Sequence, residues 1–259
     1  MQKILLSVLF GLLLGCNNKD NPNTLTIGTI SGPETALAEA ARDVAKDKYG
    51  LNVKIVEFTD YNLPNEALND KSLDANVYQH LPYLKAAMAT HGYQLEAIGK
   101  TFIYPMAIYS QKHKKLTELT DNDIVAIPND PSNENRALLL LQKAGLITLD
   151  NNEASSVHGI KDNPHHLDFK EMDAAQLPRI LPDVDVAVIN TTFAIPAGLS
   201  PSKDALLQED KDSPYANIIV IRQNTDKKKA LDEFVKAFNS KPVEEKAKAL
   251  FGDAAIPAW

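Results

Sequence analysis

The chain has 259 residues, of which 44% are apolar, 24% are charged and one is a cysteine. This apolar content is sufficient for one large core or two smaller ones, and a single cysteine excludes an internal disulfide. The formal net charge of −7, with no long basic run, argues against nucleic acid as a main partner.

The N-terminal segment has the features of a targeting sequence. A positively charged start precedes the mostly apolar run Ile4–Leu14, which is too short to span a bilayer and suits a signal peptide. The run ends in Leu13-Leu-Gly-Cys16, which looks like a bacterial lipoprotein box, in which the cysteine is acylated (palmitate being one such acyl chain) and becomes the first mature residue. We therefore expect residues 1–15 to be a signal peptide, Cys16 to be lipidated and residues 16–23 to be a flexible tether. The alternative is an ordinary signal peptide with an incidental cysteine.

The next segments predict a parallel sheet covered by helices. Leu25–Ile30 alternates like a strand, a helix follows from near Pro33 to Gly50, and Leu51–Phe58 is a second strand. This strand–helix–strand order is typical of parallel sheets. The glycines near the first strand do not make a phosphate-binding fingerprint.

Aromatic side chains with polar tips are concentrated in Asp74–Leu84, where Tyr78, His80 and Tyr83 lie close in sequence. Such a cluster is more often packing, but its mixed character also suits the wall of a half-apolar pocket. His80 is also a candidate base or metal ligand. However, no carboxylate, serine or cysteine stands beside it at a recognisable motif spacing.

The segment Thr101–Ser110 is apolar and contains a proline. We interpret it as the first connection out of one lobe of the molecule. The basic run Gln111–Lys115 that follows is predicted to be a solvated loop.

A strand, a tight turn and a helix are predicted over Asp123–Gly145. The apolar run Ile124–Ile127 suits a strand covered on both faces, and Asp130 and Ser132 are both good N-caps for the helix that follows. Gly145 closes the helix.

Asn133 and Arg136 fall in or near the first turns of this predicted helix. Helical side chains lean toward the N-terminus, so Arg136 can extend into the crevice beyond the strand's carboxyl end, where open α/β sheets bind ligands. A guanidinium there is a two-pronged donor shaped for a carboxylate. The alternative is a solvated helix arginine.

The segment Leu146–Leu167 is polar and irregular. The stretch Asn163–Asp168 contains His165 and His166, which is weak evidence for a metal site. Phe169–Leu181 is predicted to be a short helix.

Two asparagines stand at the ends of apolar strands. Asn190 follows the predicted strand Val184–Ile189 at its carboxyl end, and open α/β sheets bind ligands in the crevice beyond such strand ends. The simpler role for Asn190 is to cap a turn. The second apolar strand that could cross back is predicted over Ser213–Arg222. Asn217 stands at the start of its apolar run, where a polar side chain must face a partner or a cavity. Amphipathic helices are predicted over Lys227–Asn239 and Glu244–Phe251.

Five stretches together resemble the methionine-binding lipoprotein family, the substrate-binding component of a methionine ABC importer, which includes lipoprotein-28-like members. They are Asp60–Leu68, Asp74–Leu84, Ile127–Leu138, Asp185–Asn190 and Ser213–Val220. The resemblance covers about Leu25 to Trp259. Tyr78 stands where many members are expected to have phenylalanine, and Ser132 where they have threonine, so Tyr78 bears on side-chain preference.

The resemblance implies an α/β, two-lobed periplasmic-binding-protein fold of type II-like topology. Each lobe would be a mixed, mostly parallel sheet flanked by helices, and two hinge strands would join them. Residues 24–108 would form lobe 1, residues 109–216 lobe 2, and residues 217–259 the return to lobe 1.

The resemblance also implies a role for each candidate residue. Arg136 would pair with the ligand carboxylate; Asn190 and Asn217 would bind its ammonium or carboxylate group, with help from Asn133. The thioether side chain would be enclosed by Tyr61, Tyr78, His80 and Tyr83.

The implied function is capture of L-methionine and its delivery to an ABC importer permease and ATPase, with no enzymatic activity, cofactor or metal. The protein would be lipid-anchored in the bacterial cell envelope, on a periplasmic or cell-surface face. Open alternatives are D-methionine, a methionine-containing dipeptide or another apolar amino acid as ligand, a hydrolase using His80 or the His165/His166 pair, and an adhesion lipoprotein.

Overall fold

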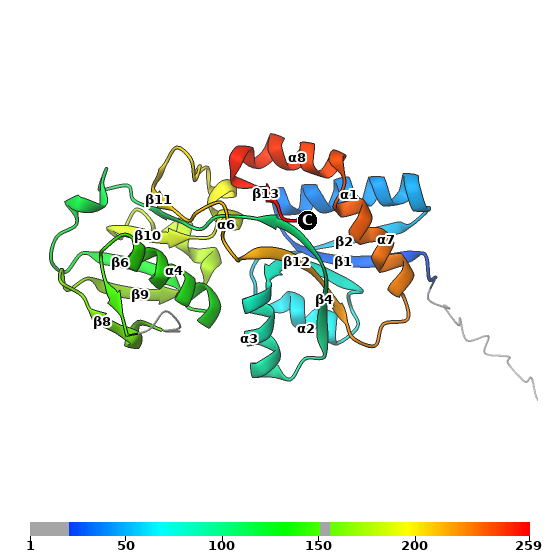
Figure 1. The fold of residues 1–259 in the computed structure, drawn as a ribbon, viewed down its shortest axis with the longest axis horizontal. Coiled ribbons are helices and arrows are strands. Elements are labelled where there is room, and N and C mark those ends of the chain that lie inside the picture. Colours follow the sequence, from blue (N-terminus) through cyan, green and yellow to red (C-terminus); the bar gives the residue numbers. More distant parts are fainter. Residues whose placement is uncertain (1–20, 151–155) are drawn as a thin grey trace, which may run out of the picture.

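The computed structural model describes residues 21–150 and 156–259, which form two lobes, each built on its own sheet (Figure 1). The expected signal peptide, residues 1–15, lies outside the described residues, as do Cys16 and most of the expected tether. Within the described ranges, no helix has the length and apolar character needed to cross a membrane.

The first lobe contains a six-stranded sheet in the order β13-β4-β12-β3-β1-β2. Its strands are β1 (Thr24–Ile30), β2 (Asn52–Phe58), β3 (Ala75–His80), β4 (Leu95–Ile103), β12 (Ala216–Arg222) and β13 (Ile256–Pro257). Helices cover both faces: α1 (Pro33–Tyr49), α7 (Lys228–Phe238) and α8 (Lys241–Phe251) on one, α2 (Leu63–Asn69) and α3 (Leu81–His91) on the other (Figure 1).

Strand β12 shows why this sheet must be covered on both sides. Ile219 and Ile221 are buried in the core beneath α1, α7 and α8, whereas Ile218 and Val220 are buried in the opposite core beneath α2 and α3. The continuous apolar run in the sequence therefore alternates between two cores, as expected for a central strand.

The second lobe contains a five-stranded sheet in the order β11-β5-β10-β6-β9. Its strands are β5 (Ala107–Tyr109), β6 (Ile124–Pro128), β9 (Asp168–Met172), β10 (Val186–Ile189) and β11 (Ala205–Gln208). The flanking helices are α4 (Pro131–Lys143), α5 (Leu177–Ile180) and α6 (Thr191–Ala194), and a small hairpin is formed by β7 (Thr148–Leu149) and β8 (Ile160–Asp162).

The two faces of this sheet also have separate cores. Val186 and Val188 of β10 pack with the apolar side of α4, whereas Ala187 and Ile189 belong to a core on the other face. That second core also includes Tyr78 of the first lobe. Apolar burial thus continues from one lobe into the other.

The predicted two-lobed α/β fold is confirmed, and both sheets are mixed, but parallel pairs do not dominate. Among the described strands, β2–β1, β1–β3, β10–β6 and β6–β9 are parallel, and the other pairs within the two sheets are antiparallel. The reason lies in the connections. β4 and β5 carry the chain out of the first lobe, and β11 and β12 carry it back, so neighbouring outgoing and returning strands run in opposite directions.

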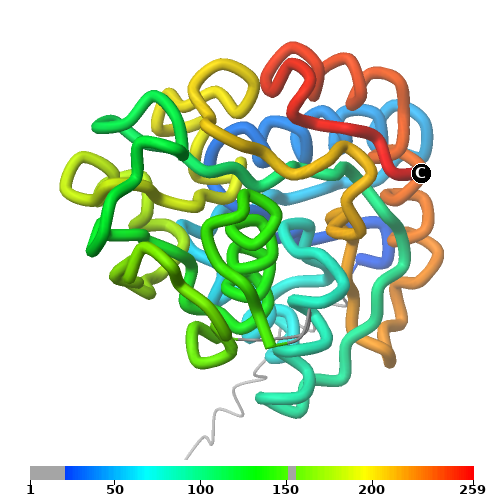
Figure 2. The backbone as a smooth tube through the Cα atoms, turned by 60° about the vertical axis from the view of Figure 1, so that its left-hand side comes forward, coloured from blue at the N-terminus to red at the C-terminus, as the bar shows by residue number. Residues whose placement is uncertain are grey.

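The chain crosses between the lobes in two adjacent segments. It leaves the six-stranded sheet after Ile103 and joins the five-stranded sheet at Ala107, then returns between Gln208 and Ala216. The two crossings run side by side in both views (Figures 1 and 2), and the Glu209 amide donates to the Met106 carbonyl at 2.9 Å.

Two predictions for the second lobe were wrong in detail. Residues 169–172, predicted as part of a helix, belong to β9, which pairs in parallel with β6; only Leu177–Ile180 is α-helical. A sheet edge supplied a hydrogen-bonding partner that the local sequence does not reveal. The polar stretch Leu146–Leu167 is not wholly irregular, because it contains the β7–β8 hairpin.

Candidate ligand-binding site

A cavity enclosed by mostly buried side chains lies between the two lobes. All eight residues predicted from the sequence line it: Tyr61, Tyr78, His80, Tyr83, Asn133, Arg136, Asn190 and Asn217. Gln79, Tyr104, Thr191 and Thr192 also contribute to the wall.

The cavity lies at the carboxyl ends of parallel strands from both sheets. His80 ends β3, α4 begins three residues after β6 ends at Pro128, and Asn190 directly follows β10. Because the carboxyl ends of parallel strands meet at one edge of a sheet, both lobes present polar side chains to the same space. The topology therefore positions the site.

Helix α4 places Arg136 beside the cavity. The Asp130 side chain caps this helix by accepting a hydrogen bond from the Asn133 amide at 2.9 Å, and Pro131 is the first helical residue. Arg136 lies in the second turn and is only 4% exposed. It is therefore not a solvated helix arginine.

The guanidinium of Arg136 is held by groups of its own chain. Nε donates to Oε1 of Glu209 at 2.7 Å, and Nη2 donates to the other Glu209 oxygen and to the Tyr104 carbonyl at 2.8 Å. Its central carbon lies 4.5 Å from the ring centroid of Tyr215. A guanidinium has five N–H groups, and these contacts use three, so the two on Nη1 are without a partner among the described residues and remain for a ligand.

The amides of the site are each held by a partner within their own lobe. Asn190 Nδ2 donates to Asn133 Oδ1 at 2.9 Å, and Asn217 Nδ2 donates to the Tyr78 carbonyl at 3.2 Å. Within the described part of the chain, Asn190 Oδ1 and the Tyr78 hydroxyl are buried without hydrogen-bond partners. A buried polar atom without a partner is costly, so both are candidates for bonding to a bound molecule.

Three tyrosines form an aromatic wall. The ring centroids of Tyr61, Tyr78 and Tyr83 are 5.8 to 5.9 Å apart in all three pairs, and Phe193 adds a fourth ring 4.8 Å from Tyr61. The Tyr83 hydroxyl donates to the Tyr61 carbonyl at 2.9 Å, which fixes one side of the wall. Burial raises the pKa of Tyr61 and of Tyr78 well above the usual tyrosine value, so these rings are neutral.

His80 is a neutral member of the wall. Burial, reinforced by the nearby Arg136 charge, lowers the pKa of His80 to about 3. Its Nδ1 accepts from the Tyr83 amide at 3.3 Å and caps α3, so the proton is on Nε2, which lies 3.4 Å from Asn133 Oδ1. A histidine with a lowered pKa is a poor base, which disfavours a hydrolase that uses His80.

Glu34 was missed by sequence reasoning. It is a 6% exposed carboxyl group in the first turn of α1, and it accepts a hydrogen bond from the Thr192 hydroxyl of α6 at 2.7 Å, which joins the two lobes. Burial raises the pKa of Glu34 to about 8. Glu34 lies just beyond the carboxyl end of β1, and this position in the sequence could have marked it as a candidate site residue.

Glu209 was also missed. Glu209 lies in the polar segment between β11 and β12, where the sequence favours a solvent-exposed acidic side chain. Its partner Arg136 is 73 positions away in sequence. No short-range pattern carries that information.

The histidines near the second lobe's surface do not form the weakly predicted metal site. His165 Nδ1 is 3.7 Å from Asp121 Oδ1, and both side chains are largely exposed. Among residues 21–150 and 156–259, the His, Cys, Asp and Glu side chains close enough to share an ion are His113, Asp123 and Asp185.

A family model described as NlpA lipoprotein matches residues 25–259. The chain belongs to the NlpA lipoprotein family. The methionine-binding lipoprotein resemblance found in the sequence is thereby confirmed, because the D-methionine-binding lipoprotein MetQ of Escherichia coli K12 is 47% identical over 252 residues, covering 95% of this chain and 93% of that protein.

Solved structures of similar proteins have the same fold. An ABC transporter periplasmic substrate-binding protein from Coxiella burnetii is 55% identical, with a TM-score of 0.87 over 90% of this chain and 100% of that one. A nutrient binding protein from Burkholderia cenocepacia, solved bound to methionine, is 45% identical, with a TM-score of 0.88 over 91% of this chain and 100% of that one.

Proposed function

We propose that this NlpA lipoprotein captures L-methionine in the cavity between its lobes and delivers it to the permease of an ABC importer. The observation that carries the proposal is the pairing, in one enclosed cavity, of a partly satisfied guanidinium and an unpartnered amide oxygen with a wall of neutral aromatic rings. These groups complement the two charges and the apolar side chain of an amino acid. The names of the relatives point to methionine, one being a D-methionine-binding lipoprotein and another having been solved bound to methionine.

The charges of the cavity suit a zwitterion. Arg136 is already balanced by Glu209, and His80 is neutral, so a ligand with no net charge adds none. We assign the ligand carboxylate to Nη1 of Arg136, where two N–H groups are available. We assign the ammonium group to Asn190 Oδ1, with Asn217 and Asn133 completing the polar end.

The apolar side chain is assigned to the aromatic wall. Sulfur–aromatic contacts contribute about 0.3–1.5 kcal/mol each, and Tyr61, Tyr78 and Tyr83 can supply several of them. The Tyr78 hydroxyl, buried without a partner among the described residues, is the group best placed to alter side-chain preference.

Calorimetry on the purified protein tests the site. We expect L-methionine to bind with one site per chain, and Arg136→Ala and Asn217→Ala each to weaken binding at least tenfold. Arg136→Lys is expected to weaken it as well, because an ammonium cannot reproduce the fork. Arg42→Lys is the matched control, because the Arg42 side chain is 37% exposed, lies away from the cavity on α1, and pairs with Glu39 and Asp43 at the surface, where such pairs contribute little. Unchanged affinity in both alanine variants would remove the assignment.

The same assay separates the ligand alternatives. D-methionine, norleucine and a methionine-containing dipeptide are titrated in parallel with L-methionine. Norleucine keeps the chain length but lacks the sulfur, so weaker binding of norleucine measures the sulfur–aromatic contribution. Tighter binding of D-methionine or the dipeptide would reassign the ligand within the same site.

We also propose that Cys16 carries lipid and that the protein is held at a membrane of the cell envelope as a non-catalytic receptor. Family membership and the lipoprotein box support this assignment. A Cys16→Ser variant is expected to move from the membrane fraction to the soluble fraction while it retains methionine binding. An unchanged membrane fraction would contradict lipid anchoring.

A further inference from the structure

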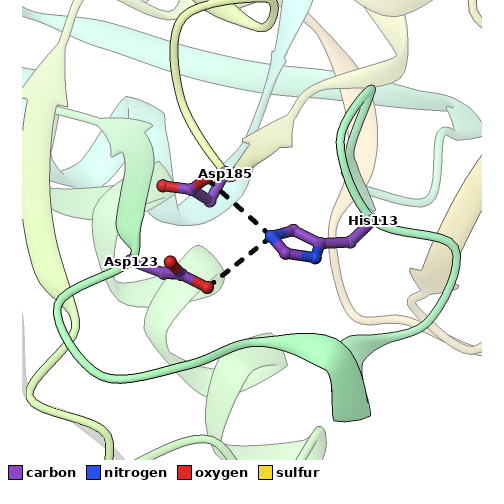
Figure 3. Close-up of side chains that lie close together, drawn as sticks. All are labelled: His113, Asp123 and Asp185. Atoms are coloured by element: carbon purple, nitrogen blue, oxygen red, sulfur yellow. Dashed lines mark ion pairs between the residues drawn. The ribbon is translucent and has the colours of Figure 1, made fainter.

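Three side chains meet at the end of the second lobe that faces away from the ligand cavity. His113 lies in the loop after β5, Asp123 directly precedes β6, and Asp185 directly precedes β10 (Figure 3). β5 runs antiparallel to β10, so its end meets the beginnings of β10 and β6. His113, predicted as part of a solvated loop, is instead 82% buried, its side chain being 18% exposed.

The spacing between these groups is too long for hydrogen bonds. His113 Nε2 is 3.6 Å from Asp123 Oδ2 and 3.8 Å from Asp185 Oδ1 (Figure 3). N–H···O bonds fall at about 2.7–3.2 Å. By contrast, two ligands that each lie about 2.1 Å from one zinc ion are about 3.4–3.6 Å apart at tetrahedral to trigonal angles. The His113–Asp123 distance falls in this range, the His113–Asp185 distance of 3.8 Å is slightly longer, and the three ligand atoms all lie within 4.8 Å of one another.

The imidazole nitrogen that faces the two carboxylates lacks a hydrogen-bond partner in the described part of the chain. Within the described residues, His113 Nε2 is buried and has no hydrogen-bond partner. An unsatisfied buried polar atom costs about 1–3 kcal/mol. Coordination to a cation would satisfy it.

The two carboxylates are already oriented by backbone groups. Asp185 Oδ2 accepts from the Ile124 amide at 2.8 Å, and Asp123 Oδ2 accepts from the Thr120 amide at 2.8 Å. The His113 amide donates to Ser110 Oγ at 2.9 Å, which fixes the loop. Such outer contacts are typical of metal sites, where they hold ligands in place before the ion binds.

A partly exposed cation, which also lies 3.4 Å from the Asp183 carbonyl, occupies the edge of this cluster. Lys112 Nζ is 3.0 Å from Asp185 Oδ1, and its side chain is 42% exposed. Exposed lysine pairs contribute little to stability, so this ammonium can move into solvent when a stronger cation arrives.

We propose that His113, Asp123 and Asp185 form a binding site for a divalent transition-metal ion, for which zinc is the probe. One imidazole and two carboxylates are ligands that zinc accepts, with water completing the coordination. The ion would join three segments of the second lobe: the loop after β5 and the starts of β6 and β10. The site is separate from the ligand cavity, so metal binding does not depend on the proposed function.

Calorimetry with zinc chloride on the chelator-treated full chain tests the proposal. We expect one zinc per chain, with binding weakened at least tenfold in His113→Ala and in Asp185→Asn, and a rise in melting temperature on zinc addition. Lys112→Ala is expected to bind zinc several-fold more tightly, because a competing cation is removed. This last variant changes an exposed side chain, so it keeps the test informative if the other two fold poorly.

His165→Ala is the matched control, because His165 is an exposed histidine near Asp121 on the same lobe. Its zinc binding should match that of the unaltered protein. No zinc binding to the unaltered protein would overturn the proposal and leave His113 as an ordinary ion pair. Binding that survives His113→Ala, or that is lost only in His165→Ala, would also overturn it.

Discussion

The positive charge of Arg136 is neutralised by a carboxylate of the same chain, that of Glu209, before any ligand binds. Glu209 accepts from Nε and Nη2 of Arg136, and Glu209 Oε2 also accepts from the Met106 amide at 2.9 Å. One carboxylate therefore holds the arginine and both interlobe crossings together. This makes Glu209 a positioning residue for the proposed carboxylate contact.

The first prediction concerns that buried pair. Glu209→Gln removes the charge partner of an arginine that is 4% exposed, so we expect the free energy of unfolding to fall by about 3 kcal/mol. Asp210→Asn is the control, because Asp210 pairs with Lys143 on the surface and should change stability by less than about 0.5 kcal/mol. Urea unfolding measures both, and equal effects in the two variants would contradict the argument.

The second prediction concerns Glu34. Its pKa is about 8 in the folded protein against an ordinary value of 4.5, so the folded state keeps a proton that the unfolded state releases. The resulting stability is fully present below about pH 4.5 and is lost as the pH rises to about 8. We expect the free energy of unfolding to decline between pH 5 and 8 less steeply in Glu34→Gln than in the unaltered protein. Glutamine does not titrate, and its side-chain oxygen can still accept the hydrogen bond from Thr192. Identical pH profiles would refute this.

At the scale of the element, the strand–turn–helix from β6 to α4 was predictable because its signals are local. The apolar run, the prolines and the capping residues all lie within a few positions of one another. The helix start was ambiguous between Asp130 and Ser132, and the structure selects Asp130, whose side chain accepts from the Asn133 amide.

The third prediction uses this ambiguity. Asp130→Ala removes the cap and two further bonds from Asn133 Nδ2, so we expect a loss of about 1–2 kcal/mol and weaker ligand binding through a displaced Asn133. Ser132→Ala is the matched control, because Ser132 Oγ has no hydrogen-bond partner within the described residues. Thermal unfolding and ligand titration of both variants provide the measurement. A larger effect in Ser132→Ala would reverse the assignment.

Strand β9 and the His113 loop show where sequence reasoning failed. Phe169–Met172 has no strong strand signal of its own and becomes a strand because β6 offers it a free edge. The basic run around His113 looks solvated, yet Asp123 and Asp185 reach the imidazole from distant segments. In both cases the deciding contacts are long-range, as they are for Glu209.

At the scale of the molecule, the cavity is enclosed by side chains from both lobes, and Glu34 and Thr192 join the lobes beside it. We therefore expect a ligand to enter when the lobes separate about the two crossings. Ligand contacts with both lobes are expected to favour the described arrangement, in which the lobes touch, over more open ones.

The fourth prediction follows from this enclosure. Addition of L-methionine is expected to reduce the radius of gyration of the ligand-free protein, measured by small-angle X-ray scattering, because the ligand favours closure. Arg136→Ala at the same methionine concentration should show a smaller change. A radius that is identical with and without ligand would contradict ligand-linked closure.

Both the first described strand and the last belong to the six-stranded sheet, β1 starting at Thr24 and β13 ending at Pro257. A tether attached at either terminus, natural or engineered, is therefore connected to the first lobe. The second lobe can then move relative to the first without moving the attachment point. A fluorophore pair that records this movement needs one dye within residues 107–208.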